Sequence, residues 1–326
     1  MKRILLLTLL LVPAVSLLYS QNDLKARNEY EEAEKVFTES NYSAALEKIA
    51  TVEGLLGKWV PKVSYLKIRS LQRLADQDES SQLYLPKLKD EVARYMKYAA
   101  DNKDNVTQES FDEVYMIEKE LNDPELRRAR IKKQNEEWFS KGMTYYNTKD
   151  YTGALPWFMK AAVEGNADYA MSMLGTMSEL GFGLPLSASK AIEWYTKAVG
   201  KGGIVKNIDI VAVQGIYRLG GNDVPKNYAK CMEWNEKITD DPTIGAGSMG
   251  TIGDLYAEGG YGIEQDYAKA VEWWSKAVEK AKSSYDKYTI MEKIADLYRE
   301  GGHGLQKDKK LAGEWESKAK LEKSRF

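Results

Sequence analysis

The chain lacks the residue types on which several classes of site depend. It has one cysteine, Cys231, and one histidine, His303, among 326 residues. A single cysteine excludes an intramolecular disulfide framework and a cysteine-rich zinc site, and a single histidine excludes a site that needs two imidazoles. Its 47 basic and 49 acidic residues give a formal charge of −2. That balance gives no electrostatic basis for binding nucleic acid, which requires a clustered basic surface. We therefore expect no cofactor, no metal and no nucleic-acid partner.

Long apolar runs are also scarce, and the clearest one lies at the start. Two basic residues precede an apolar run over 4–12, which is followed by small residues. This pattern predicts a signal peptide over residues 1–20, cleaved after Ser16 or Ser20. The run is shorter than the roughly 20 apolar residues that cross a bilayer, and no cysteine follows it to carry a lipid. We expect an exported, soluble protein of the periplasm or the extracellular space, with no integral membrane segment once the signal is removed.

Aromatic residues are unevenly distributed, because eight tryptophans and 21 tyrosines stand against only 6 phenylalanines. Five tryptophans recur at spacings of 37, 40, 39 and 42 residues: Trp157, Trp194, Trp234, Trp273 and Trp315. A small residue lies three positions before each, and in four of the five an alanine lies four positions after it. On a helix these positions share one side. We expect Trp273 and its equivalents to be buried between hairpins, and Trp59 and Trp274 to be the surface aromatics.

A second series of residues keeps the same phase as the tryptophans. Seven positions before each lies a residue that accepts a hydrogen bond from free helical amides: Asp150, Ser187, Asn227, Asp266 and Asp308. Asn41 occupies the same place in an earlier segment. Such a cap stabilises a helix by roughly 1 kcal/mol. The six residues therefore predict the starts of six helices, each the second of a hairpin.

The segments before these caps predict the first helices of the same hairpins. Small residues lie in the middle of each, where they permit close helix crossing: Gly175, Gly215, Gly253 and Ala295. The first helices should end at glycines with left-handed backbone: Gly181, Gly220, Gly259 and Gly301. One hairpin cannot bury its apolar face alone, so the units must stack. The predicted fold class is all-α, an α-α superhelix of stacked helical hairpins.

These residues resemble two related families of helical hairpins. Residues 135–168 resemble a tetratricopeptide repeat through Trp138, Gly142, Tyr145, Tyr151, Ala154, Phe158 and Ala161, although Lys141 departs from that pattern. From about Ala167 to Ala319 the chain resembles Sel-one-like repeats, through Gly-x-Gly loops and a following Asp-x-x-Lys-Ala-x-x-Trp, as at 266–273. The unit at 204–239 departs most, because Asn222 and Asp223 disrupt its loop.

The resemblance and the helical patterns together divide the chain after the signal peptide. Residues 22–123 are expected to form diverged tetratricopeptide-like hairpins, and 124–166 a long helix with a tetratricopeptide-like unit. Residues 167–326 are expected to form Sel-one-like repeats, at about 167–202, 204–241, 243–281 and 285–320, with a polar capping helix at the end. Within the diverged part, one buried helical stripe is predicted by the spacing of Leu85, Leu88, Val92, Tyr95 and Ala99.

The residues that invite a catalytic interpretation have simpler structural ones. Cys231 replaces the small residue three positions before a tryptophan, and His303 is a lone loop imidazole. The glycine-rich loops join two helices and precede no Gly-Lys-Ser/Thr, so they are not phosphate loops. The loops that carry Asp266 and Asp308 lack the alternating oxygen ligands that calcium sites need. We therefore expect a protein that is not an enzyme.

Both families act mainly as binding scaffolds, and the resemblance implies the same role here. It implies an exported, non-catalytic scaffold that binds a protein or peptide through its concave face, in cell-envelope assembly, signalling or secretion. The alternative is a glycan- or peptidoglycan-binding module, which Trp59 and Trp274 support. A cell-wall-related hydrolase is less well supported, because the exported Sel-one-like proteins linked to that activity are cysteine-rich.

In tetratricopeptide hairpins the first helix lines the inner groove, so the resemblance also implies binding residues. They are Glu136, Phe139, Met143, Tyr146, Asn147, Thr176, Glu179, Asp254, Glu292, Asp296 and Arg299. The first group offers apolar side chains and the later group is polar and mostly acidic. This composition suggests a partner with an apolar anchor at one end and basic residues towards the other. The alternative is that Phe139 and Met143 pack under the preceding helix.

Overall fold

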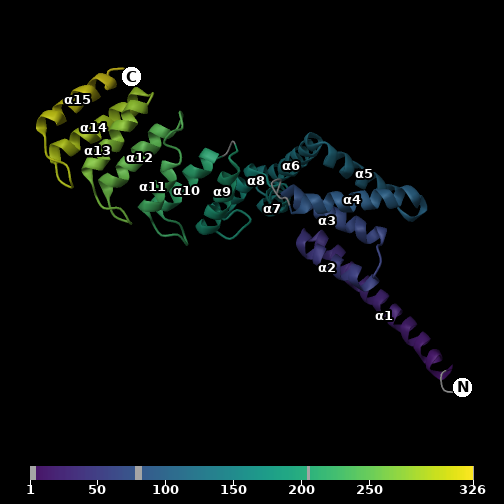
Figure 1. Ribbon diagram of the computed structural model, residues 1–326. Coiled ribbons are helices and arrows are strands. Elements are labelled where there is room, and N and C mark those ends of the chain that lie inside the picture. The colour runs from purple at the N-terminus through teal and green to yellow at the C-terminus, as the bar shows by residue number, and fades with distance from the viewer. Residues whose placement is uncertain (1–4, 78–82, 204–205, 326) are drawn as a thin grey trace. The chain divides into compact units, whose positions relative to one another are not determined.

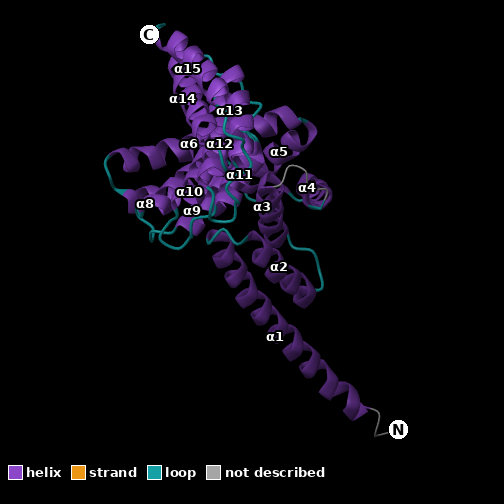
Figure 2. Cartoon of the chain, turned by 90° about the vertical axis from the view of Figure 1, so that its left-hand side faces the viewer, coloured by secondary structure: helices purple, strands orange, loops and turns teal. Residues whose placement is uncertain are grey.

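Helices make up the regular structure of the chain, in line with the predicted all-α class. The computed structural model describes residues 5–77, 83–203 and 206–325, with side chains from residue 21 onward. Within those ranges there is no β-strand, only two isolated bridges in glycine-rich loops, and Figure 2 shows helices joined by loops. The predicted signal peptide, residues 1–20, lies outside the part whose side chains are described. No helix in the described part is long and apolar enough to cross a membrane.

The helices follow one another in hairpins along the chain (Figure 1). In order they are α1 (Leu5–Thr38), α2 (Tyr42–Leu56), α3 (Pro61–Gln77), α4 (Tyr84–Asp101), a 3₁₀ turn (Lys103–Asn105), α5 (Gln108–Asn122), α6 (Pro124–Asn147), α7 (Tyr151–Met159), a π turn (Lys160–Glu164), α8 (Asp168–Leu180), α9 (Ala188–Lys201), α10 (Lys206–Leu219), α11 (Tyr228–Glu236), α12 (Gly245–Glu258), α13 (Tyr267–Lys280), α14 (Ser284–Glu300) and α15 (Lys309–Lys323). They form two compact units. Unit 1 comprises residues 1–140 and 163–166, and unit 2 comprises 141–162 and 167–326.

Unit 1 has an apolar core between α3, α4 and α5. Leu88, Val92, Tyr95 and Ala99 of α4 are buried against this core, and Leu85 packs at its edge. The helical stripe predicted over 85–99 is therefore confirmed. Periodic apolar residues place α4, although no repeat motif marks it.

Buried carboxylates make further contacts between the helices of unit 1. Asp76, which is 5% exposed, accepts hydrogen bonds from Arg127 (2.9 Å) and Arg130 (2.7 Å). Arg130 also binds Glu120 at 2.8 Å, so the network joins α3, α5 and α6. Glu91 of α4 accepts a hydrogen bond from the indole of Trp59 at 3.0 Å. Trp59 is half-buried, packs against the core of unit 1 and is bound to α4, so its interpretation as a surface aromatic is wrong.

The second helices begin at the six predicted capping residues. In each, a side-chain oxygen accepts a hydrogen bond from a backbone amide of the first turn, at 2.9–3.2 Å. The capped helices are α2 (Asn41), α7 (Asp150), α9 (Ser187), α11 (Asn227), α13 (Asp266) and α15 (Asp308). The four predicted terminal glycines of the first helices all have positive φ, from 63° to 80°. The hairpin register predicted from the sequence is confirmed.

In α7, α9 and α13 the buried aromatic lies one position after the periodic tryptophan, whereas in α11 the periodic Trp234 is itself buried, as predicted. Phe158, Tyr195 and Trp274 are 0–3% exposed, whereas Trp273 is only half-buried. The predictions that Trp273 is a core residue and Trp274 a surface residue are therefore wrong. Counted from the small residue, positions 0, 4 and 7 form the buried stripe, and the tryptophan at position 3 lies on its flank.

Glycines of the first helices make room for these rings. A Cβ atom added to Gly142, Gly175 or Gly253 would overlap the ring of Phe158, Tyr195 or Trp274, respectively. The close crossing predicted from the mid-helix glycines is therefore confirmed in these hairpins, because only glycine lets the ring lie against the helix backbone.

Consecutive hairpins of unit 2 are joined through their glycine-rich loops. The carbonyl oxygens of Tyr261 and His303 accept hydrogen bonds from the amides of Tyr228 (2.9 Å) and Tyr267 (2.8 Å), the first residues of the preceding second helices. The paired rings lie 5.0 and 4.8 Å apart. Each loop therefore caps the helix of the hairpin before it.

The loop at Asn222 and Asp223 makes the same connection with side chains. The amide of Ala188 donates to Asn222 Oδ1 at 2.9 Å, and that of Ser189 donates to Asp223 Oδ1 at 3.0 Å. Hydrogen bonds from Ser189 and Ser187 hold the pKa of Asp223 at about 2. The sequence suggested that these two residues disrupt the loop, and this is wrong. Their side chains accept the hydrogen bonds from α9 that a backbone carbonyl accepts in the other loops.

Candidate functional site

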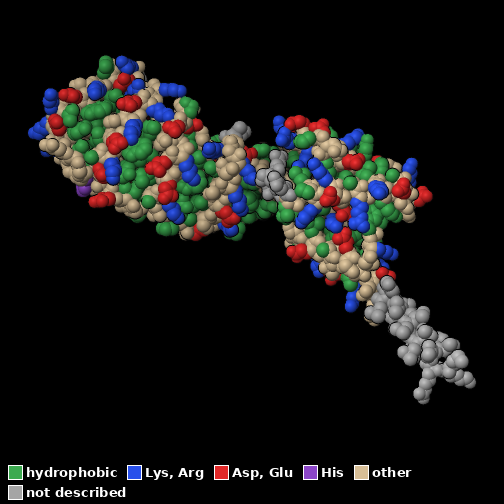
Figure 3. All heavy atoms as spheres, viewed as in Figure 1, with side chains coloured by type: hydrophobic (Ala, Val, Ile, Leu, Met, Phe, Trp, Pro, Cys, Tyr) green, Lys and Arg blue, Asp and Glu red, His purple; other side chains and the backbone are tan. Residues whose placement is uncertain are grey.

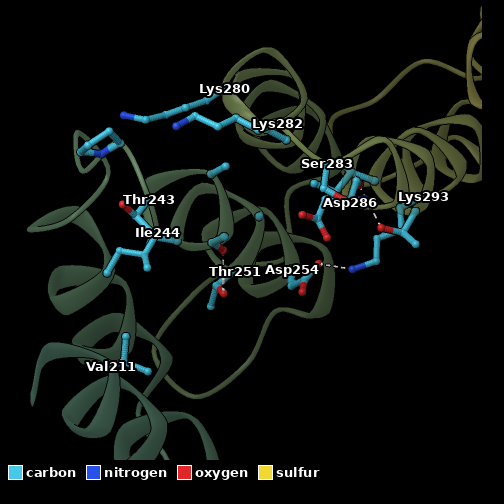
Figure 4. Close-up of a pocket in the computed structure, with 18 of the residues that line it drawn as sticks. Val211, Thr243, Ile244, Thr251, Asp254, Lys280, Lys282, Ser283, Asp286 and Lys293 are labelled. Carbon is cyan, nitrogen blue, oxygen red and sulfur yellow. Dashed lines mark hydrogen bonds and ion pairs between the residues drawn. The ribbon is translucent and has the colours of Figure 1, made fainter. Parts of the chain in front are cut away.

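A groove crosses the first helices of unit 2. It has a volume of about 650 Å³ and is lined by α10, α12, the start of α14 and the segment between α13 and α14. Figure 4 shows Val211 on one side, Thr251 and Asp254 along the middle, and Lys293 with Asp286 on the other. The groove therefore runs across successive hairpins on their first helices.

Small residues of α12 form the floor of this groove. A Cβ atom added to Gly247 would meet no atom within 4 Å, and one added to Gly250 would meet only Ile290, at 3.8 Å. Thr251 follows on the same helix and lies in the groove (Figure 4). Because these side chains are short, the backbone of α12 lies close to the open space, where an extended peptide could pack against it.

Charged side chains of both signs line the groove. Asp254 accepts a hydrogen bond from Lys293 at 2.7 Å and lies 3.8 Å from Arg218. Lys280 donates to the carbonyl of Thr239 at 2.7 Å. The groove therefore presents acidic and basic side chains beside aliphatic ones such as Val211, rather than a mostly acidic surface.

The predicted binding residues of α6 divide between the two units. Glu136 and Phe139 belong to unit 1, and Met143, Tyr146 and Asn147 to unit 2. Glu136 and Asn147 are exposed, and the other three are half-buried. The ring of Tyr146 lies 5.1, 6.2 and 6.5 Å from those of Tyr151, Phe158 and Phe182. Tyr146 thus packs within its own unit, in an aromatic cluster that joins α6 to the next hairpin.

Several of the later predicted residues form hydrogen bonds with the buried aromatic side chain of the second helix. The hydroxyl of Tyr195 donates to Glu179 at 2.8 Å and lies 3.2 Å from Thr176 Oγ1. In the same way, the indole of Trp274 donates to Asp254 Oδ1 at 3.1 Å. These carboxylates face the groove side of the hairpin but also bind the polar end of a core aromatic.

The last predicted residues lie at the end of unit 2. Glu292, Asp296 and Arg299 line a smaller hollow of about 310 Å³ between α14 and α15. Arg299 pairs with Asp296 and with Glu316 of α15. Of the eleven predicted residues, Asp254 alone lines the main groove.

The sequence predicted neither the charged walls of the groove, such as Lys282 and Asp286, nor its small and aliphatic residues. The missed residues also include Val211, Gln214, Ile244, Gly247 and Thr251. The signal that could have indicated them is the run of small residues over 245–248, with a further glycine at 250, which is unusual for a helix. That run shows where side chains are short, but the opposing walls come from helices more than 30 residues away.

Each periodic tryptophan is covered by a lysine of its own helix. A lysine three residues further on lies over each ring, at 3.6–5.4 Å from the ring centre: Lys160, Lys197, Lys237, Lys276 and Lys318. A cation over the ring face is favourable electrostatically, and residues three apart on a helix meet. One face of each ring, on which a sugar would stack, is therefore occupied by a lysine.

The candidate catalytic side chains have structural settings. Cys231 is fully buried, and this burial raises the pKa of its thiol to about 11. His303 packs its ring against Tyr267 in the loop described above. In the described part of the chain, no cluster of three or more histidine, cysteine or acidic side chains could hold a metal ion. On the face of the molecule in Figure 3, basic and acidic side chains are interspersed.

A model of one protein family matches the repeated hairpins of unit 2. The family model described as the Sel1 repeat matches residues 168–203, 215–238, 249–281 and 291–321. A Sel1 repeat protein from Oxalobacter formigenes is 24% identical, over 54% of this chain and 67% of that one, with a TM-score of 0.38. The protein c5321, a protective antigen of uropathogenic Escherichia coli with an SLR fold, is 17% identical over 93% of this chain, with a TM-score of 0.42. The match spans 64% of the antigen's chain. No curated protein matches the chain significantly.

Proposed function

Because four of its hairpins are Sel1 repeats, we propose that this chain is a non-catalytic scaffold that holds a peptide segment of a partner protein. The groove over α10, α12 and α14 carries this proposal. Its floor is unobstructed backbone, its walls offer aliphatic side chains, and its ends offer charged ones. An extended peptide could place its backbone over the short side chains of the floor and direct alternate side chains towards the aliphatic and the charged walls.

Filling the groove tests the proposal without knowledge of the partner. A randomised peptide library is selected on the immobilised full chain, and selected peptides are then measured on variants. Gly247→Trp places a large side chain in the groove at a position where a Cβ atom meets nothing. Gly313→Trp makes the same change on α15, again in open space, outside the groove.

We expect selected peptides to lose binding to Gly247→Trp and to keep it on Gly313→Trp. Both variants should fold, because a glycine in an exposed helix is less favourable than a larger residue. Peptides that bind both variants equally would move the site elsewhere. A library that yields no binder would contradict the proposal as a whole.

A glycan- or peptidoglycan-binding role is the weaker alternative. It depends on accessible aromatic faces, but Trp274 is 3% exposed and Trp59 is half-buried. The periodic tryptophans that do reach the surface carry lysines over their rings. A hydrolase is less supported still, because the thiol and the imidazole have structural contacts.

We further propose that the scaffold acts outside the cytoplasm, in cell-envelope assembly, signalling or secretion. The support is the basic start and apolar run within residues 1–20. Expression of the full chain in a bacterial host with an intact export pathway tests this. Mass measurement should show loss of the first 16 or 20 residues, and an intact amino terminus in the cytoplasm would contradict export.

A further inference from the structure

The hairpin of α10 and α11 lacks the side chains that join the two helices of its neighbours. In the α8–α9 hairpin, Tyr195 lies against Gly175 and donates to Glu179. The equivalent positions of α10–α11 are Asn235, Gly215 and Leu219. Asn235 therefore stands where the ring would be, and an exposed leucine stands where its acceptor would be.

This replacement leaves α10 and α11 without the contact between ring and glycine that joins the helices of the neighbouring hairpins. Asn235 is 0% exposed, and its amide group donates to the carbonyl of Cys231 on its own helix, at 2.9 Å. Its Oδ1 atom has no hydrogen-bond partner. A Cβ atom added to Gly215 would meet nothing within 4 Å, so no ring lies against this glycine, although Trp234 of α11 packs in one apolar cluster with Ile210 of α10.

Other unpaired groups lie in the same hairpin. In the described residues, five buried side-chain oxygens lack a hydrogen-bond partner, and three of them belong to Asp209, Gln214 and Asn235. Asp209 is 0% exposed and receives one bond, from Ser172 of α8. A buried acceptor without a partner is destabilising by roughly 1–3 kcal/mol, equivalent to about a 5- to 150-fold change in an equilibrium.

We propose that the α10–α11 hairpin is the adjustable wall of the groove, which opens locally more readily than the hairpins on either side and shifts to admit the partner. Val211 and Gln214 of α10 line the groove, so a displacement of this helix changes its width. The local opening follows from the contacts alone. The role in admitting a partner rests on the proposed peptide-binding function.

Hydrogen exchange of the full chain, read by mass spectrometry without any ligand, tests the opening. We expect buried amides of α10 and α11 to exchange on the order of tenfold faster than those of α8–α9 and α12–α13. The double variant Leu219→Glu, Asn235→Tyr installs the ring and acceptor of α8–α9, and the space at Gly215 admits the ring. It should slow exchange in α10–α11 to the level of its neighbours, whereas Leu219→Glu alone should not.

The reciprocal variant decides the matter if the double variant does not fold. Glu179→Leu, Tyr195→Asn should transfer fast exchange to α8–α9. Wild-type exchange that is equally slow in all three hairpins would overturn the inference, as would variants that leave the pattern unchanged. Once peptides have been selected, one of them should slow exchange in α10. If no peptide binds, the proposed function is wrong, but the hydrogen-exchange comparison without ligand still tests the local opening of α10 and α11 independently.

Discussion

The two compact units pack helical hairpins by different means. Unit 2 repeats one solution, in which a ring of the second helix lies against a glycine of the first, as Tyr195 does against Gly175. Unit 1 relies on contacts that occur once, such as Asp76 between Arg127 and Arg130. Repetition makes unit 2 visible in the sequence, whereas the single contacts of unit 1 join residues more than 50 positions apart without any motif.

The strongest test of the repeated solution is removal of a buried ring. Trp274→Ala should lower the free energy of unfolding by roughly 3–5 kcal/mol, because it leaves a cavity beside Gly253 and removes the indole hydrogen bond to Asp254. Denaturation followed by far-UV circular dichroism measures the change. Trp273→Ala is the matched control and should have well under half the effect, since this ring is half-buried. Equal losses would show that the two tryptophans share the core.

Loss of one of the single contacts of unit 1 should lower the free energy of unfolding nearly as much. Asp76→Ala leaves Arg127 without a carboxylate in a largely buried place and leaves Arg130 with Glu120 alone, and should be destabilising by roughly 3 kcal/mol. The exposed carboxylate of Asp90 on α4 provides the control, and Asp90→Ala should be near neutral. Thermal denaturation of both variants separates the two outcomes. If Asp76→Ala melts like the parent, the ion network does not hold α6 to α3.

Helix caps occur in both units, so their removal should affect the two units in the same way. Asp266→Ala should lower the stability of unit 2 by roughly 0.5–2 kcal/mol, since it removes the acceptor of the Lys269 amide. Glu264→Ala, in the preceding loop, changes a nearby exposed carboxylate that caps no helix. Urea titrations of the two variants should differ by this amount, and coincident midpoints would deny the cap its role.

The smallest expected effect concerns pH in the weak hairpin. Burial raises the pKa of Asp209 to about 6, and Asp168 of α8 adds to this rise, while Tyr195 of α9 also lies near. A raised pKa means that stability is lost as pH rises towards 6 and is regained on acidification. Relative to Asp209→Asn, the wild type should gain up to about 1 kcal/mol between pH 7 and pH 5. A difference that stays constant with pH would show that Asp209 does not titrate in this range.

The fold was largely predictable because its signals are local. A cap depends on one residue type at one position, so the six caps and the hairpin register could be read directly. The buried aromatic was assigned one position too early, because the most regular residue of the repeat is the flanking Trp273 and not Trp274. Position on a helix face depends on where the partner helix lies, and the sequence of one helix does not specify that.

The candidate site was less predictable. Asp254 was identified, but Gln214, Gly247 and Thr251 were not, because the groove is defined by short side chains and by the space above them. Thr176 and Glu179 were assigned to a ligand although they bind Tyr195. A polar residue on a first helix serves the second helix as readily as a partner, and only the three-dimensional contacts separate the two roles.

The loops of unit 2 also determine which segment is the exchangeable module. Since the carbonyl of His303 binds the first amide of α13, that helix start depends on a loop that follows it in the chain. A segment bounded by hairpin ends would therefore sever this bond, whereas one that begins at a second helix and continues through the next loop would preserve it. Duplication or deletion within the array should thus be tolerated best in that frame, with each join placed inside a glycine-rich loop after its aromatic residue.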